Sequence, residues 1–158
     1  MSSPKKVVIV PCSGIGKTYG TVSREAAYEV VEDKRPDETQ LVALSLLVLG
    51  DEDARVAVTS HPAVSIDGCK LACATKMVAE SGGVVAAELA VLDVYRRYRQ
   101  FKPHGIAELN DGGQKLANAL AMEICEIVDD LLASEGQTSA GEISNKQPIS
   151  KKSGESDA

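Results

Sequence analysis

Residues 7–12 read Val7-Val8-Ile9-Val10-Pro11-Cys12, an apolar run that ends in a proline and a thiol. The run over residues 5–11 is rich in β-branched side chains and is followed by Gly14, a combination typical of a buried strand. Residues 18–32 then place apolar side chains at helical spacing. The apolar face comprises Val22, Ala26, Ala27, Val30 and Val31. A buried strand followed by an amphipathic helix favours an α/β fold.

The same alternation continues along the chain. The expected elements are a short strand passing into a helix over residues 41–49, a strand over 64–67, a helix over 69–81, a strand over 84–92, a short basic helix or loop over 95–101 and a long helix over 111–133. These elements predict a small parallel sheet with helices on both faces, a Rossmann-like three-layer α/β sandwich.

The chain of 158 residues suits one domain with one core. We expect this domain to span residues 1–134. Residues 135–158 are dominated by Ser, Gly, Lys, Glu and Gln with almost no large aliphatic side chains, so we expect a disordered tail there.

The formal net charge of −6 argues against a general nucleic-acid-binding protein. The basic stretch with aromatic residues over 96–102 is interpreted as a solvated helix face or a protein contact. No apolar run reaches the roughly 18 residues of a membrane span, and residues 1–10 lack the pattern of a signal peptide. We therefore expect no membrane partner and a cytoplasmic protein, whose thiols stay reduced.

Three thiols follow or lie near predicted strand ends. Cys12 follows the first strand, Cys69 follows the strand over residues 64–67, and Cys73 comes four residues later. Open parallel sheets bind ligands beyond the carboxyl ends of their strands, and neighbouring strands lie about 4.8 Å apart. If these two strands are neighbours, the thiols can meet at Zn–S bond lengths of about 2.3 Å. Cys69 and Cys73 would share one helix face. Burial as small hydrophobic core residues is the alternative reading of all three.

The motifs around these thiols resemble a known family. Cys12-Ser13-Gly14 after the first strand, Asp67-Gly68-Cys69 after the later one, and Cys73 downstream resemble the DGC family, small prokaryotic proteins named for the Asp-Gly-Cys motif and described as zinc-binding. The resemblance runs from about residue 7 to residue 81, and more loosely to residue 91. It implies that Cys12, Cys69 and Cys73 are metal-chelating positions, supported by Ser13, Gly14, Asp67 and Gly68. The family pattern has a further cysteine in the middle aliphatic segment, and residues 41–47 contain none.

A fourth ligand must therefore come from elsewhere or be absent. Cys125 is the first candidate, although its place beside an apolar helical stripe also suits a core residue. Asp67 is the second, although its position before a helix suits an N-terminal cap better. His61 precedes the strand whose other end carries Cys69, which places it far from the site. His104 lies between proline and glycine and is interpreted as a loop residue.

The leading hypothesis is binding of Zn²⁺ through these thiolates, with an Fe–S cluster as the alternative metal group. A cysteine-dependent redox or sulfur-transfer protein is a second reading. A third is a degenerate phosphate-binding loop, because residues 11–18 end in Gly16-Lys17-Thr18 between a strand and a helix. Pro11 stands in place of that loop's first glycine and offers no N–H to a phosphate.

Overall fold

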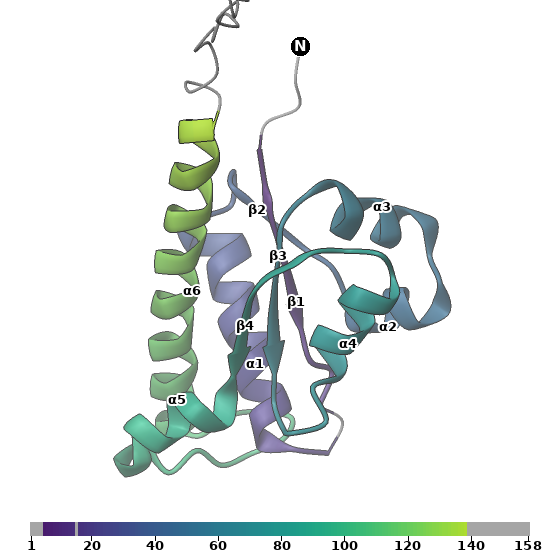
Figure 1. Cartoon of the computed structure of the whole chain (residues 1–158). Helices are drawn as coiled ribbons and strands as arrows, with labels where there is room; N and C mark the ends of the chain where they lie inside the picture. Colours follow the sequence, from purple (N-terminus) through teal and green to yellow (C-terminus); the bar gives the residue numbers. More distant parts are fainter. Residues whose placement is uncertain (1–4, 15, 139–158) are drawn as a thin grey trace, which may run out of the picture.

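The structure is a computed structural model that describes residues 5–14 and 16–138. Within these residues one sheet is formed by four parallel strands in the order β2-β1-β3-β4 (Figure 1). The strands are β1 Val7–Pro11, β2 Thr39–Leu41, β3 Ala63–Asp67 and β4 Val85–Ala90. The helices are α1 Thr18–Tyr28, α2 Leu44–Leu49, α3 Glu52–Ser60, α4 Cys73–Glu80, α5 Val91–Arg97 and α6 Asp111–Thr138, with a π-helical segment at Glu29–Lys34 and a 3₁₀ turn at Arg99–Phe101.

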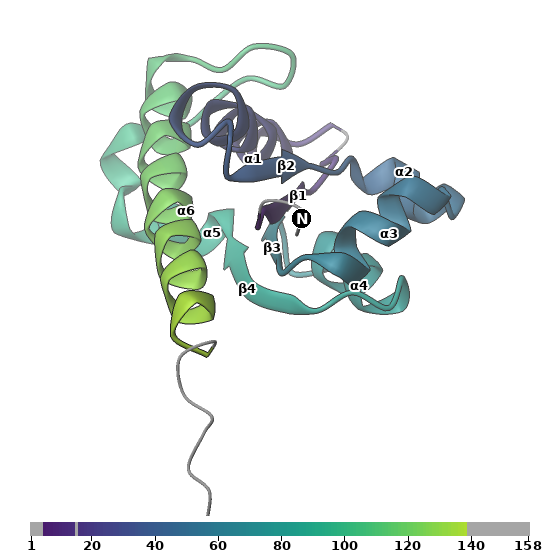
Figure 2. The ribbon, with the colours of Figure 1, turned by 90° about the horizontal axis from the view of Figure 1, so that it is seen from above.

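Helices cover both faces of the sheet, which confirms the predicted three-layer α/β architecture (Figure 2). Alternate residues of β1 point to opposite faces, as the two-residue period of a strand requires. Val7 and Ile9 pack with α1, α5 and α6, whereas Val8 and Val10 pack with α2, α3 and α4. Because both faces are buried, the central strand is an uninterrupted apolar run rather than an alternating one.

The strand order reverses between β1 and β3. From β1 the chain crosses through α1 on one face to β2, and from β3 it crosses through α4 on the opposite face to β4. Such a switch point leaves an open crevice beyond the carboxyl ends of the two central strands. In Figure 1 these ends lie at the lower edge of the sheet.

Several predicted boundaries differ from the observed ones. The first helix changes to a π-helix at Glu29. This π-helical segment, Glu29–Lys34, leads into the turn before β2. The strand expected over residues 84–92 ends at Ala90, because Val91 already begins α5. The long helix continues to Thr138, so the first residues of the expected tail are helical. Residues 139–158 lie outside the described part of the chain.

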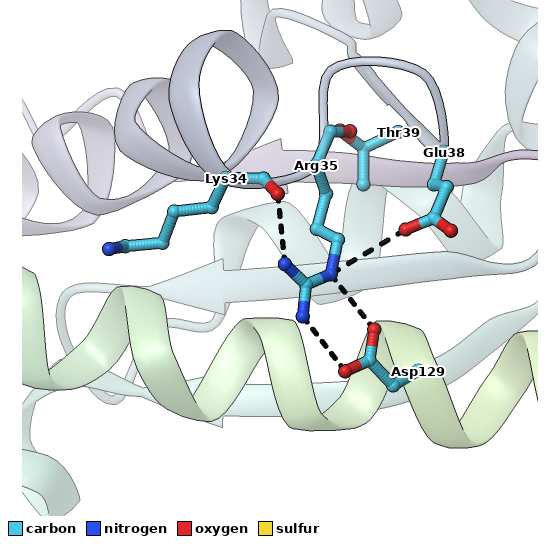
Figure 3. A network of polar contacts seen from close by, with 5 residues as sticks. All are labelled: Lys34, Arg35, Glu38, Thr39 and Asp129. Atoms are coloured by element: carbon cyan, nitrogen blue, oxygen red, sulfur yellow. Dashed lines mark hydrogen bonds and ion pairs between the residues drawn. The ribbon is translucent and has the colours of Figure 1, made fainter.

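Arg35 ties α6 to the turn before β2 (Figure 3). Its Nε and Nη2 donate to the two carboxylate oxygens of Asp129, each at 2.9 Å. Glu38 Oε2 lies 3.5 Å from the same Nε. This paired hydrogen bonding holds the pKa of Asp129 below its usual value, and the same bond raises the pKa of Arg35. The network lies beside the amino-terminal edge of the sheet, opposite the crevice.

None of the described helices is both long enough and apolar enough to cross a membrane.

Candidate functional site

β1 and β3 are neighbours, as the thiol hypothesis requires. Their register pairs Val10 with Ser65 and Pro11 with Ile66. The next residue, Cys12, donates its backbone N–H to the carbonyl oxygen of Ile66 at 2.8 Å. The backbone of Cys12 is therefore held against the carboxyl end of β3. This fixes the point from which the Cys12 side chain projects.

Three glycines let the two loops approach the start of α1. A Cβ on Gly14 would lie 2.1 Å from the Cα of Gly20, and Gly14 also has a left-handed φ of +53°. A Cβ on Gly68 would lie 3.2 Å from the backbone nitrogen of Gly20. The loop after β1, the loop after β3 and the first turn of α1 thus meet backbone to backbone. Side chains at these positions would separate the elements that carry the thiols.

Side chains of α1 hold the loop after β1. The Ser23 hydroxyl donates to the carbonyl oxygen of Cys12 at 3.0 Å. The Arg24 guanidinium donates to the carbonyl oxygen of Ser13 and, at 3.1 Å, to the hydroxyl of Thr21. Ser13 thus takes part in fixing the loop through its backbone carbonyl oxygen. The sequence pattern gave no reason to single out Ser23 or Arg24, because these contacts depend on how the loop folds back over α1.

The helix expected to begin at Cys69 begins at Cys73 instead. Asp67, at the end of β3, accepts hydrogen bonds from the backbone N–H groups of Ala74 and Thr75 at 2.8 and 3.2 Å, and from the Thr75 hydroxyl at 2.6 Å. Because the capping carboxylate lies seven residues before Ala74, the intervening chain must loop out before the helix can start. The prediction that Cys69 and Cys73 share a helix face was therefore wrong.

The segment between these two thiols is a tight turn. The backbone N–H of Ala72 donates to the carbonyl oxygen of Cys69 at 3.2 Å, and Ala72 has a left-handed φ of 52°. Such a conformation is costly for a residue with a side chain, by on the order of 1 kcal/mol or more, and clusters at binding sites. Asp67 stabilises this turn from one end by fixing the start of α4.

Asp67 binds the first-turn N–H groups of α4 as a cap does, although Ala72 rather than Asp67 occupies the N-cap position, and its role as a metal ligand is not supported. The carboxylate is only 4% exposed, and both of its oxygens already accept hydrogen bonds from α4. Because these bonds fix the carboxylate at the start of α4, it is committed to holding that helix.

The three predicted thiols line one surface pocket of about 260 Å³. Cys12 is buried at 7% exposure, Cys69 is half-buried and Cys73 is exposed. The lining residues are Cys12, Ser13, Gly14, Lys17, Leu44, Cys69, Leu71 and Cys73. Lys17, Leu44 and Leu71 were not predicted as part of a metal site. Within the described residues, no group of three or more His, Cys, Asp or Glu side chains is already arranged as a metal cluster.

The other fourth-ligand candidates lie elsewhere. Cys125 does not line the pocket, because α6 directs it into the core cluster with Val30 and Val128. Burial raises the pKa of its thiol, which opposes formation of the thiolate that a metal needs. His61 precedes β3 and so lies at the opposite edge of the sheet from Cys69, as expected. His104 is exposed in the loop before α6.

The segment that imitates a phosphate-binding loop occupies the same end of the sheet. Lys17 is the last residue before α1, and its backbone N–H donates to the carbonyl oxygen of Gly14 at 3.0 Å. Pro11 is the final residue of β1 and carries no N–H. The loop therefore presents Lys17 to the thiol pocket without the full set of backbone donors that a nucleotide phosphate uses.

The sequence matches the family model of the DGC domain over residues 8–112. This span begins in β1, includes all three pocket thiols and ends at the start of α6. No curated protein and no solved structure matches the chain.

Proposed function

The chain belongs to the DGC-domain family, and from that premise we propose that it binds a metal ion, Zn²⁺, through the thiolates of Cys12, Cys69 and Cys73. The observation that carries the proposal is that three cysteines from two neighbouring strand ends line one pocket at the switch point of the sheet. Thiols gathered by chance burial would be packed with core side chains, as Cys125 is.

The donor set fits a soft or borderline metal. Of the described residues, three cysteines but no carboxylate or imidazole line the pocket, which disfavours Mg²⁺ and Ca²⁺ and suits Zn²⁺. An Fe–S cluster would use the same ligands and is the alternative group. The single carboxylate in the motif, that of Asp67, is occupied with α4.

The protein positions the three thiols, and each thiol binds metal after it loses its proton. Cys12 is held by its strand and by Ser23, whereas Cys69 begins the turn before α4 and Cys73 begins α4 itself, both more exposed than Cys12. Each thiol must lose its proton to bind, so metal uptake releases protons and weakens in acid. A zinc ion with three protein ligands and one open position would supply Lewis-acid polarisation of a bound molecule.

The test is metal analysis of the full chain purified without chelator, with two serine variants. We expect about one equivalent of zinc in the wild type, loss of that metal in Cys69→Ser, and its retention in Cys125→Ser, the matched control. Equal zinc content in all three proteins would refute the proposed ligands. An iron-dependent absorption band in the wild type would indicate that the bound group is an Fe–S cluster rather than zinc.

Thiol chemistry without a metal is the second candidate. It is favoured by the placement of a half-buried and an exposed cysteine on either side of one turn in the same pocket. In that case Cys69 or Cys73 would act in redox or sulfur transfer. A metal-free wild-type protein in which Cys69 alkylates much faster than a model thiol would support this candidate over metal binding.

A further inference from the structure

Lys17 lines the same pocket as the three thiols, and among the residues that the structure describes it is the only charged side chain in that lining. We propose that the pocket binds a small anionic thiol, a compound that carries both a thiol and a carboxylate, with Lys17 neutralising the carboxylate. This inference deepens the proposed function, because the ligand's sulfur would complete the coordination of the metal. Its anion-binding part is testable without any metal.

The charge distribution around the pocket supports an anionic ligand. The stretches that line it, residues 12–17 and 69–73 together with Leu44 of α2, contain two basic residues and no acidic one, in a chain whose net charge is −6. The two basic residues are Lys17 and Lys70. Within the part of the chain that the structure describes, Lys17 forms no ion pair with a carboxylate. Basic side chains beside a pocket on an acidic protein attract small anions to it.

The remaining lining residues limit the ligand's size and donor atom. Leu44 and Leu71 supply the apolar part of the wall, against which the carbon chain of a ligand can pack. A volume of about 260 Å³ lies below the usual range for drug-sized ligands and suits a molecule of few atoms. Residues 5–14 and 16–138 bring no fourth sulfur, imidazole or carboxylate to the pocket, so a soft fourth donor would come with the ligand.

The first experiment uses metal-free protein and compares two alkylating reagents of similar size, the anion iodoacetate and the neutral iodoacetamide. The ratio of their rates at Cys69 and Cys73 cancels differences in thiolate population. We expect this ratio to exceed that of a model thiol and to fall roughly two- to fivefold in Lys17→Gln, as for one charge a few ångströms away in water. Lys5→Gln is the matched control, because Lys5 precedes β1 at the opposite edge of the sheet. A ratio equal to that of the model thiol, or one unchanged in Lys17→Gln, would overturn the anion site.

The second experiment uses cobalt-loaded protein, whose visible absorption reports on the metal's ligands. Mercaptoacetate and 2-mercaptoethanol differ chiefly in the carboxylate. We expect mercaptoacetate to change the spectrum at a concentration several-fold lower, and this preference to disappear in Lys17→Gln but not in Lys5→Gln. Equal affinity for the two thiols, or no spectral change with either, would overturn this inference while leaving metal binding intact. Failure to bind cobalt at all would instead refute the proposed function, and the alkylation ratio would still decide the anion site.

Discussion

Cys12 and Cys125 are both buried, at 7% and 4% exposure, yet they lie in contrasting surroundings. Cys12 sits at the carboxyl edge of the sheet beside two further thiols and Lys17. Cys125 is a residue of α6 and packs in the core, near the Arg35–Asp129 network at the amino-terminal end of the sheet. Burial therefore does not separate a functional thiol from a packing one in this chain. The neighbouring side chains distinguish the two thiols, because a metal site needs several donor atoms around one accessible pocket.

Exchanging each of these cysteines for serine gives the largest expected contrast. Cys12→Ser should weaken zinc binding by at least about a hundredfold, since even residues that only support metal ligands contribute ten- to a hundredfold. Cys125→Ser should leave zinc affinity unchanged and lower the free energy of unfolding by about 1–3 kcal/mol, because a hydroxyl enters an apolar core. Competition titration with a chelator and urea unfolding measure the two effects. Similar zinc affinities in both variants would contradict the assignment of Cys12 as a metal ligand and Cys125 as a core residue.

The glycine contact beneath the pocket provides a second contrast. Gly14→Ala should destabilise the protein by on the order of 3 kcal/mol, because its Cβ would lie 2.1 Å from the Cα of Gly20. Gly16→Ala is the control: Gly16 also has a positive φ, of +74°, but nothing lies within 4 Å of an added Cβ. Its cost should stay near 1 kcal/mol, the strain of a left-handed alanine. Equal losses in thermal or urea unfolding would mean that the loop after β1 does not meet the backbone of α1 at Gly20.

The sequence predicted the fold well because its signals are local. A fully buried central strand needs an uninterrupted apolar run, and residues 7–11 supply it. The start of α4 could not be predicted in the same way. Its capping group, Asp67, lies seven residues before the first N–H that it binds, and the left-handed Ala72 carries no sequence signature of such a turn.

The candidate site was predictable only in part for a related reason. The positions of Cys12 and Cys69 follow from strand ends, which the sequence marks. Lys17 and Leu44 reach the same pocket from segments whose approach depends on the packing of α1 and α2. That packing is a property of the folded chain as a whole.

The next smaller effect is the loss of stability that the buried Cys125 thiol causes at alkaline pH. Because burial raises the pKa of Cys125 in the folded state, the folded protein holds this proton more tightly than the unfolded chain does. The associated stability is fully present below the unfolded thiol pKa of about 8.5 and is lost as the pH rises through the higher folded value. Urea unfolding from pH 7 to pH 10 should show a steeper loss in the wild type than in Cys125→Ala. Parallel curves would contradict the assignment of Cys125 to a desolvated core position.

The Arg35–Asp129 pair should give the smallest effect. Its partners are well exposed, and exposed ion pairs contribute little and are screened by salt. Asp129→Asn should lower Tm by a few degrees at most and leave zinc binding unchanged. Since Arg35 lowers the pKa of Asp129, the contribution is present above the carboxylate's unfolded pKa and is lost as the pH falls through its folded value. A Tm difference that persists unchanged at pH 2 or in 1 M salt would indicate a role other than the ion pair.

X-ray absorption at the zinc edge tests the central claim most directly, because it counts the sulfur atoms around the metal. We expect three sulfurs at about 2.3 Å and one lighter ligand in the zinc-loaded full chain without added thiol. Cys73→Ser should reduce the count to two, and Cys125→Ser should leave it at three. A count of three or more in Cys73→Ser, or a first shell of nitrogen and oxygen only in the wild type, would contradict a three-thiolate site at the ends of β1 and β3.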